Sequence, residues 1–143
     1  MTPSFPVVIF HNPDCETSRN VLRIIEAAGY RPEIALYVQT GWTRGPLLAL
    51  LAAAGLSLRA ALRESKSPAK ELGLLEPGVD DAALLAAMLT HPVLVNRPLV
   101  ATPRGVKLCR PSETVLDLLA TWPKGPFYKE DGALLIDADG NRH

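Results

Sequence analysis

The 143-residue sequence is poor in cysteine, in net charge and in long apolar runs. Two cysteines are too few for a disulfide scaffold, and no charged-then-apolar leader precedes a small-residue cleavage site, so we expect a protein of the reducing cytoplasm. Lys plus Arg and Asp plus Glu both number 15, so no overall positive field attracts nucleic acid or an anionic membrane. The longest strongly apolar stretch, Pro46 to Leu58, is too short for a membrane span of about 20 residues. Neither nucleic acid nor a membrane is expected as a partner.

What is present is the composition of an ordinary globular protein. Hydrophobic residues make up 48% of the chain and charged residues 21%, which excludes a disordered or collagen-like chain. The length favours one domain over residues 1–143. Ten of the cations are Arg and five are Lys, and guanidinium forks match tetrahedral oxyanions better than ammonium groups do.

The first third of the chain has the pattern of a βαβ unit. The apolar run Pro6 to Phe10 reads as a buried strand that ends in the turn His11 to Asp14. Apolar residues then recur at helical spacing from Thr17, and Gly29 is placed to end that helix. A second β-rich run, Glu33 to Val38, completes the unit, with the two strands parallel.

The rest of the chain continues as helices and then ββα. Residues 43–90 have an interrupted helical pattern, which predicts a helical insertion. Leu99 to Ala101 and Gly105 to Leu108 flank a turn, as a β-hairpin would, and Ser112 opens a helix. The tail, residues 122–143, has one short apolar run, Ala133 to Ile136, and is otherwise expected to be extended or loosely docked. The fold class is therefore α/β.

Cys15 is the candidate nucleophile because it lies at the junction between the first predicted strand and the helix that follows. Unpaired N–H groups and the helix dipole favour an anion there, so the thiol should ionise readily. His11 can add positive charge or a hydrogen bond, and Thr17 and Ser18 can donate hydroxyls. Glu16 either raises the pKa of the thiol or points to solvent. The alternatives are a cysteine that serves as a small hydrophobe, a histidine bonded to backbone, and hydroxyls that cap the helix.

Candidate anion ligands are arginines held by their neighbours. Arg97 and Arg110 each stand between an apolar run and a proline, which restricts the backbone before it. Arg63 is a further candidate, with Arg59 on the same predicted helical face as its rival. All of these are ordinary surface arginines in the alternative interpretation.

Cys109 ends an apolar strand and is taken as structural, although a disulfide or relay with Cys15 stays open. His91 and His143 have no partner at the spacing of metal ligands, so no metal site is expected.

The segment from His11 to Asn20, His-Asn-Pro-Asp-Cys-Glu-Thr-Ser-Arg-Asn, closely resembles the nucleophile loop of the glutaredoxin-coupled bacterial arsenate reductases. The resemblance covers almost the whole chain and its blocks keep their order. They are Leu58 to Arg63, His91 to Pro98, Leu108 to Glu113, and Lys129 to Gly132.

The resemblance implies a thioredoxin-like fold with a helical insertion. It implies that Cys15 attacks arsenate, that His11 helps keep the thiol ionised, and that Ser18 assists the thiolate. In the family, arginines matching Arg63, Arg97 and Arg110 hold the oxyanion. Pro98 matches a proline that commonly follows a cis peptide bond.

Arsenate, glutathione and glutaredoxin are the partners that the resemblance implies, with glutathione as co-substrate and no bound cofactor. Two other interpretations remain at this point. One is a glutathione-dependent thiol oxidoreductase of the same fold that does not use arsenate, against which the three arginines argue. The other is a thioredoxin-like redox regulator, against which the lack of a CxxC pair at Cys15 argues.

Overall fold

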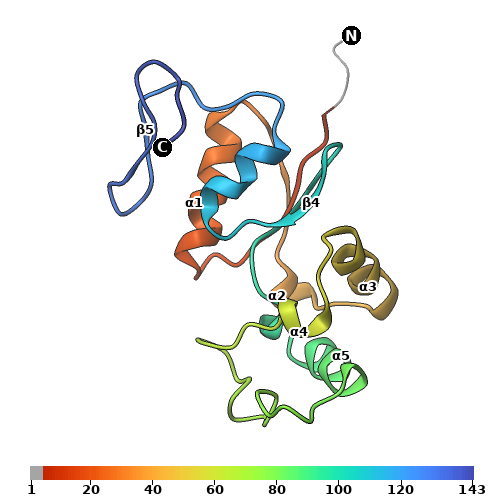
Figure 1. The fold of residues 1–143 in the computed structure, drawn as a ribbon. Coiled ribbons are helices and arrows are strands. Elements are labelled where there is room, and N and C mark those ends of the chain that lie inside the picture. The colour runs from red at the N-terminus through yellow and green to blue at the C-terminus, as the bar shows by residue number, and fades with distance from the viewer. Residues whose placement is uncertain (1–4) are drawn as a thin grey trace. The chain divides into compact units, whose positions relative to one another are not determined.

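The protein's computed structural model describes residues 5–143, which divide into two compact units (Figure 1). The first unit combines the chain up to Ala35 with the chain from Arg97 onward. The second unit is Leu36–Asn96. Both sheets among the described residues belong to the first unit, and the second is built from short helices and turns.

Four short strands form the sheet of the first unit, in the order β2-β1-β3-β4. The strand β1 (Val8–Phe10) pairs in parallel with β2 (Glu33–Ala35) and antiparallel with β3 (Leu99–Thr102). β3 turns through Pro103-Arg104 into the antiparallel β4 (Gly105–Leu108). The parallel pair and the hairpin are thus both as predicted.

Helix α1 (Glu16–Ala27) connects the two parallel strands and begins one residue before the predicted start. It is amphipathic, because its buried residues recur at helical spacing. The helix ends at Ala27, and Gly29 follows it with a φ of 98°, in the left-handed region that glycine tolerates. The N–H groups of Gly29 and Tyr30 donate to the last free carbonyls, those of Glu26 and Ile25.

The predicted second strand is wrong in its C-terminal half. β2 stops at Ala35, and the short helix α2 (Tyr37–Thr40) follows in the second unit. The Tyr37 side chain is buried, its hydroxyl donates to the carbonyl of Val95 at 2.8 Å, and its ring stacks on Trp42. These tertiary contacts outweigh the β propensity of the sequence there.

The predicted helix after the hairpin is a 3-10 helix, η2 (Ser112–Leu118). Its end is fixed by the hairpin, because Thr102 Oγ1 donates to the carbonyl of Leu118 and Arg104 Nη1 to that of Leu119, both at 2.8 Å. With these carbonyls bonded to side chains, the helix does not continue.

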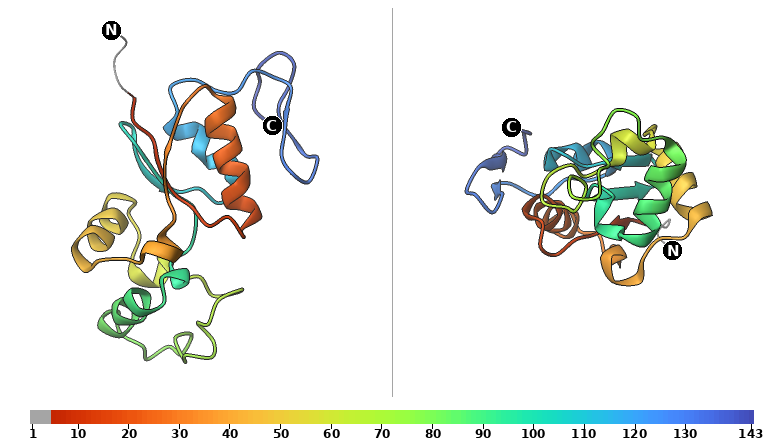
Figure 2. Two further views of the ribbon diagram at one scale, coloured as in Figure 1. Left: turned by 180° about the vertical axis from the view of Figure 1, so that it is seen from behind. Right: turned by 90° about the horizontal axis from the view of Figure 1, so that it is seen from below.

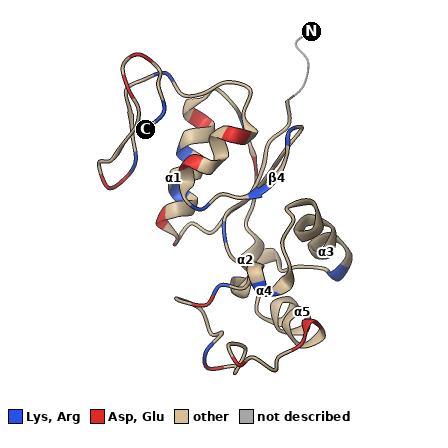
Figure 3. Cartoon of the chain, in the orientation of Figure 1, with Lys and Arg blue, Asp and Glu red and all other residues tan. Residues whose placement is uncertain are grey.

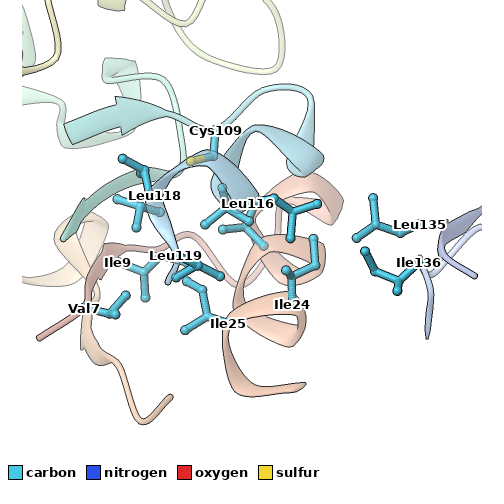
Figure 4. Packing of buried hydrophobic residues seen from close by; sticks show 13 residues of the cluster. Val7, Ile9, Ile24, Ile25, Cys109, Leu116, Leu118, Leu119, Leu135 and Ile136 are labelled. Atoms are coloured by element: carbon cyan, nitrogen blue, oxygen red, sulfur yellow. The ribbon is translucent and has the colours of Figure 1, made fainter. Parts of the chain in front are cut away.

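The core of the first unit lies between the sheet and its two helices, which cover the same face of the sheet (Figures 1 and 2). Ile9 of β1 and Val100 of β3 are register partners and are fully buried. Figure 4 shows Leu116 and Leu119 packed towards Ile24 and Ile25 of α1. This contiguous apolar cluster fixes α1 on the sheet.

The C-terminal tail is more ordered than the sequence predicted. β5 (Phe127–Tyr128) and β6 (Leu134–Ile136) form a two-stranded antiparallel sheet. Leu135 and Ile136 are buried in the core cluster and point towards α1 in Figure 4. The apolar run that the sequence singled out at residues 133–136 thus contains β6 and contributes to the core.

Four α-helices and a 3-10 helix make up the second unit. They are α2, already given, α3 (Arg44–Ala53), α4 (Leu58–Ala61), α5 (Asp81–Thr90) and η1 (Pro92–Leu94). Side chains cap two of them: Ser57 Oγ accepts the N–H of Ala60, and Asp80 Oδ1 accepts the N–H of Ala83. Within residues 5–143, no helix combines the length and apolarity that a bilayer crossing demands.

Truncating a core residue of α1 should destabilise the protein far more than the same truncation at an exposed site. We expect Ile24→Ala to lower the free energy of unfolding by about 2–5 kcal/mol, because it leaves a cavity in the core. Ile34→Ala, at a side chain that is 44% exposed, should cost less than about 1 kcal/mol. Urea denaturation measures both, and equal losses would contradict the core assignment.

Candidate active site

The nucleophile loop is the short connection between β1 and α1. Asn12 shapes it, because its Oδ1 accepts the N–H of Asp14 at 3.0 Å and its carbonyl accepts the N–H of Cys15 at 3.0 Å. Cys15 itself is the N-cap residue of α1, with extended backbone. Its side chain therefore starts at the positive end of the helix dipole.

Two arginines reach the Cys15 sulfur from the two ends of the β3–β4 hairpin. Arg110 Nη1 lies 3.6 Å from Cys15 Sγ and donates to the carbonyl of Arg97 at 3.0 Å. Arg97 is 5% exposed, and its side chain also hydrogen-bonds the sulfur. The hairpin brings the two together, since the Cys109 N–H donates to the carbonyl of Pro98 at 2.9 Å. The Arg97-Pro98 peptide bond is cis, as the resemblance implied, and so is Arg110-Pro111.

The pKa of Cys15 is lowered from the ordinary value of a thiol. Burial is the largest influence and acts in the opposite direction, because it disfavours the charged form. The Ser18 backbone N–H and the side chains of Arg97 and Arg110 together outweigh burial, because each favours the thiolate. The lowered pKa increases the fraction of Cys15 that is thiolate, which is the nucleophilic form.

His11 and Ser18 form a buried pair beside the loop. His11 Nδ1 lies 2.6 Å from Ser18 Oγ, which also accepts the N–H of Asn12 at 3.1 Å. Burial, followed by the charge of Arg19, lowers the pKa of His11 and favours its neutral form. Ser18 Oγ can both donate and accept, so the tautomer of His11 decides which of the two groups donates. His11 therefore contributes a hydrogen bond here and not a positive charge.

The second unit contains Arg63, just after α4. Its backbone N–H donates to the carbonyl of Leu94 at 2.7 Å, and Nη1 lies 3.4 Å from Asn96 Oδ1. The rival, Arg59, has a structural role, because its guanidinium donates to the carbonyls of Leu74 and Val79 at 2.8 and 3.0 Å. Arg63 as an oxyanion ligand stays a prediction.

The remaining candidates of the sequence are placed as follows. Glu16 is exposed in the first turn of α1, and Thr17 is half-buried. Cys109 is fully buried, and burial raises its pKa to about 12. Both cysteines are free thiols. Cys109 therefore belongs to the core, and its thiol is unreactive at neutral pH.

Over residues 5–143, no three His, Cys, Asp or Glu side chains are grouped so that they can hold a metal ion. His143 instead pairs with Asp137 at 2.8 Å.

Sequence reasoning gave no role to Arg19, which ties the loop to the tail. Arg19 Nη1 donates to the carbonyl of Pro13 at 2.9 Å, and its Nε and Nη2 donate to the two carboxylate oxygens of Glu130. Charges of both signs occur along α1 and the tail (Figure 3). That pattern alone does not show which of them pair.

Comparisons with known proteins show the family to which this chain belongs. A model described as the ArsC family matches residues 10–118. The arsenate reductase ArsI2 of Synechocystis is 65% identical over 136 residues, which cover 95% of this chain and 97% of that protein. An arsenate reductase of Escherichia coli is 49% identical, with 95% and 96% covered. The chain therefore belongs to the ArsC family.

Solved structures show the same fold. The arsenate reductase from Vibrio cholerae matches with a TM-score of 0.76 at 37% identity, over 82% of this chain and all of that one. A putative arsenate reductase from Yersinia pestis matches with a TM-score of 0.72 at 37% identity, over 78% of this chain and 98% of that one. The thioredoxin-like α/β fold implied by the resemblance is thereby confirmed.

Removing one guanidinium should make the Cys15 thiol harder to ionise. We expect Arg110→Ala to raise the pKa of Cys15 by about one pH unit or more, because a charged hydrogen-bond donor is lost. The pH dependence of Cys15 alkylation, followed by mass spectrometry of its peptide, measures this change. Arg104→Ala is the matched control, because that arginine bonds the carbonyl of Leu119 instead of the sulfur. An unchanged profile in Arg110→Ala would refute the electrostatic role of Arg110.

Proposed function

We propose that this protein is an arsenate reductase in which the thiolate of Cys15 attacks arsenate, with glutathione and glutaredoxin supplying the electrons. The observation that carries the proposal is the pair of arginines, Arg97 and Arg110, that hydrogen-bond a buried sulfur at a helix N-terminus. Relatives named arsenate reductase, at 65% and 49% identity over 95% of the chain, support the choice of substrate.

The arginines fit the charge of the substrate. Arsenate at neutral pH carries between one and two negative charges, and guanidinium groups bind such oxyanions by paired hydrogen bonds. In a partly dry site they also stabilise the charge that builds up on the arsenate oxygens during attack. Arg63 is the third ligand in the proposal. Phosphate has the same shape, so the selectivity comes from arsenic, which accepts sulfur more readily than phosphorus does.

The proposed reaction begins when the Cys15 thiolate displaces one arsenate oxygen, which leaves as water after protonation. The product is a sulfur–arsenic bond at Cys15. Glutathione attacks this adduct, and glutaredoxin then completes the reduction, which releases arsenite and frees the thiolate. In total, two thiols become one disulfide and give two electrons, and As(V) becomes As(III). The Ser18 backbone N–H and the arginines stabilise Cys15 again as the leaving thiolate.

The proposal needs no bound cofactor, because glutathione supplies the electrons as a co-substrate. It also needs a compartment that keeps glutathione reduced, which is the reason to place the protein in the cytoplasm. The two free cysteines agree with that choice.

A thiol oxidoreductase of the same fold that does not use arsenate is the second candidate. No observation on the first unit favours it, since a disulfide substrate needs no guanidinium beside the sulfur. The experiment below separates the two.

Arsenite formation should depend on Cys15 and not on Cys109. Purified protein is mixed with arsenate, glutathione and glutaredoxin, and arsenite is followed over time. We expect Cys15→Ser to abolish turnover, because a hydroxyl does not ionise at neutral pH, whereas Cys109→Ala should keep it. Equal rates for the wild type and Cys15→Ser would refute the proposal. Disulfide reduction without arsenite formation would favour the thiol oxidoreductase.

Arg63 and Arg59 should differ in the same assay. If Arg63 binds the oxyanion, Arg63→Ala should lower kcat/KM for arsenate by about 100-fold, as the loss of one charge-stabilising donor commonly does. Arg59→Ala should mainly lower stability, because it releases the carbonyls of residues 74–79. Equal kcat/KM for Arg63→Ala and the wild type would remove Arg63 from the site.

A further inference from the structure

The C-terminal tail is attached to α1 by polar contacts as well as by the core. Asn20 Oδ1, on a residue that is 6% exposed, accepts the backbone N–H of Glu130 at 2.9 Å. One turn further along the helix, the guanidinium of Arg23 lies 5.2 Å from the ring centroid of Phe127. These contacts set the position of the turn that carries Glu130.

Both carboxylate oxygens of Glu130 accept hydrogen bonds from Arg19. Arg19 Nε donates to one oxygen at 2.9 Å, and Nη2 donates to the other at 3.1 Å. The remaining arm of the guanidinium, Nη1, donates to the carbonyl of Pro13, two residues before Cys15. The planar guanidinium of arginine can make all three hydrogen bonds at once. The ammonium group of a lysine is a single point of charge and does not have this planar set of donors.

We propose that Glu130 is a positioning residue for the nucleophile, which it holds through Arg19 and the carbonyl of Pro13. The carbonyl of Pro13 belongs to the same turn as Asn12 and Cys15. Holding that turn keeps the Cys15 sulfur in reach of the Ser18 N–H and of Arg97 and Arg110. The tail thereby completes the site without touching the sulfur.

The charges of this network agree with a role in holding Arg19. The hydrogen bonds from Arg19 lower the pKa of Glu130, so its carboxylate stays charged at neutral pH. Arg19 is also near enough to help lower the pKa of His11. Arg23 on α1 also lowers the pKa of Glu130, and Glu16 acts on Arg19 from the first turn of the helix. Of the chain neighbours of Glu130, Asp131 is charged, and Lys129 pairs with Glu113 at 3.7 Å.

This inference rests on the proposed role of Cys15 as nucleophile, but it does not depend on arsenate as substrate. The readout is therefore the reaction of Cys15 with iodoacetamide over a range of pH, followed on its peptide by mass spectrometry. If arsenate is not the substrate, this measurement is unaffected.

Glu130→Ala and Arg19→Lys should each move the midpoint of the alkylation profile to higher pH by about half to one unit. Alkylation well below the midpoint would then be about threefold to tenfold slower, because less thiolate is present. If only the charge of Arg19 mattered, Arg19→Lys would behave as the wild type. If Glu130 acts through Arg19, adding Glu130→Ala to Arg19→Ala should produce no further shift.

Arg142→Ala is the matched control. Arg142, in the same tail, forms another ion pair at 2.8 Å, with Asp117 of η2 instead of the nucleophile loop. We expect its alkylation profile to match that of the wild type. An unchanged profile in Glu130→Ala, an equal shift in Arg142→Ala, or additive shifts in the double variant would each overturn the proposal.

Discussion

The negative charge on one sulfur atom is the constraint on which the site depends. Burial of Cys15 acts against this charge, and the Ser18 N–H, Arg97 and Arg110 act for it. A buried anion without such donors would be protonated instead. Cys109 shows this alternative within the same protein, because it is buried without guanidinium donors and its pKa rises to about 12.

The donors come from segments that only the fold brings together. The loop that carries Cys15 leaves β1, and the hairpin that carries Arg97 and Arg110 begins with β3, the antiparallel neighbour of β1. Pairing of these two strands therefore places arginines near residue 100 beside a cysteine near residue 15. The core under α1 then fixes the helix whose N-terminus faces the sulfur.

Turn residues and hydrophobic periodicity in the sequence were enough to predict the elements whose conformation is determined by neighbouring residues. The strand-loop-helix around Cys15, the glycine that ends α1, and the hairpin after Pro98 all follow from turn chemistry and periodicity. The run at Tyr37 was misjudged, because its conformation depends on burial against distant residues. Arg19 and Glu130 are 111 positions apart, and no periodicity links them.

The neutral state of His11 likewise depends on burial, which the sequence does not show. The placement of Arg97 and Arg110 at the sulfur agrees with the resemblance, and their roles in catalysis stay proposals.

The most direct test of the account is a titration of the two thiols in the folded wild-type protein, followed by the ultraviolet absorbance of the thiolate. We expect one thiol per chain to ionise clearly below the ordinary value of about 8.5, and this thiol to be Cys15. The other should stay protonated to a pH of about 12. If Cys15 titrated at or above the ordinary value, the donors around the sulfur would not stabilise its charge, and the account would be contradicted.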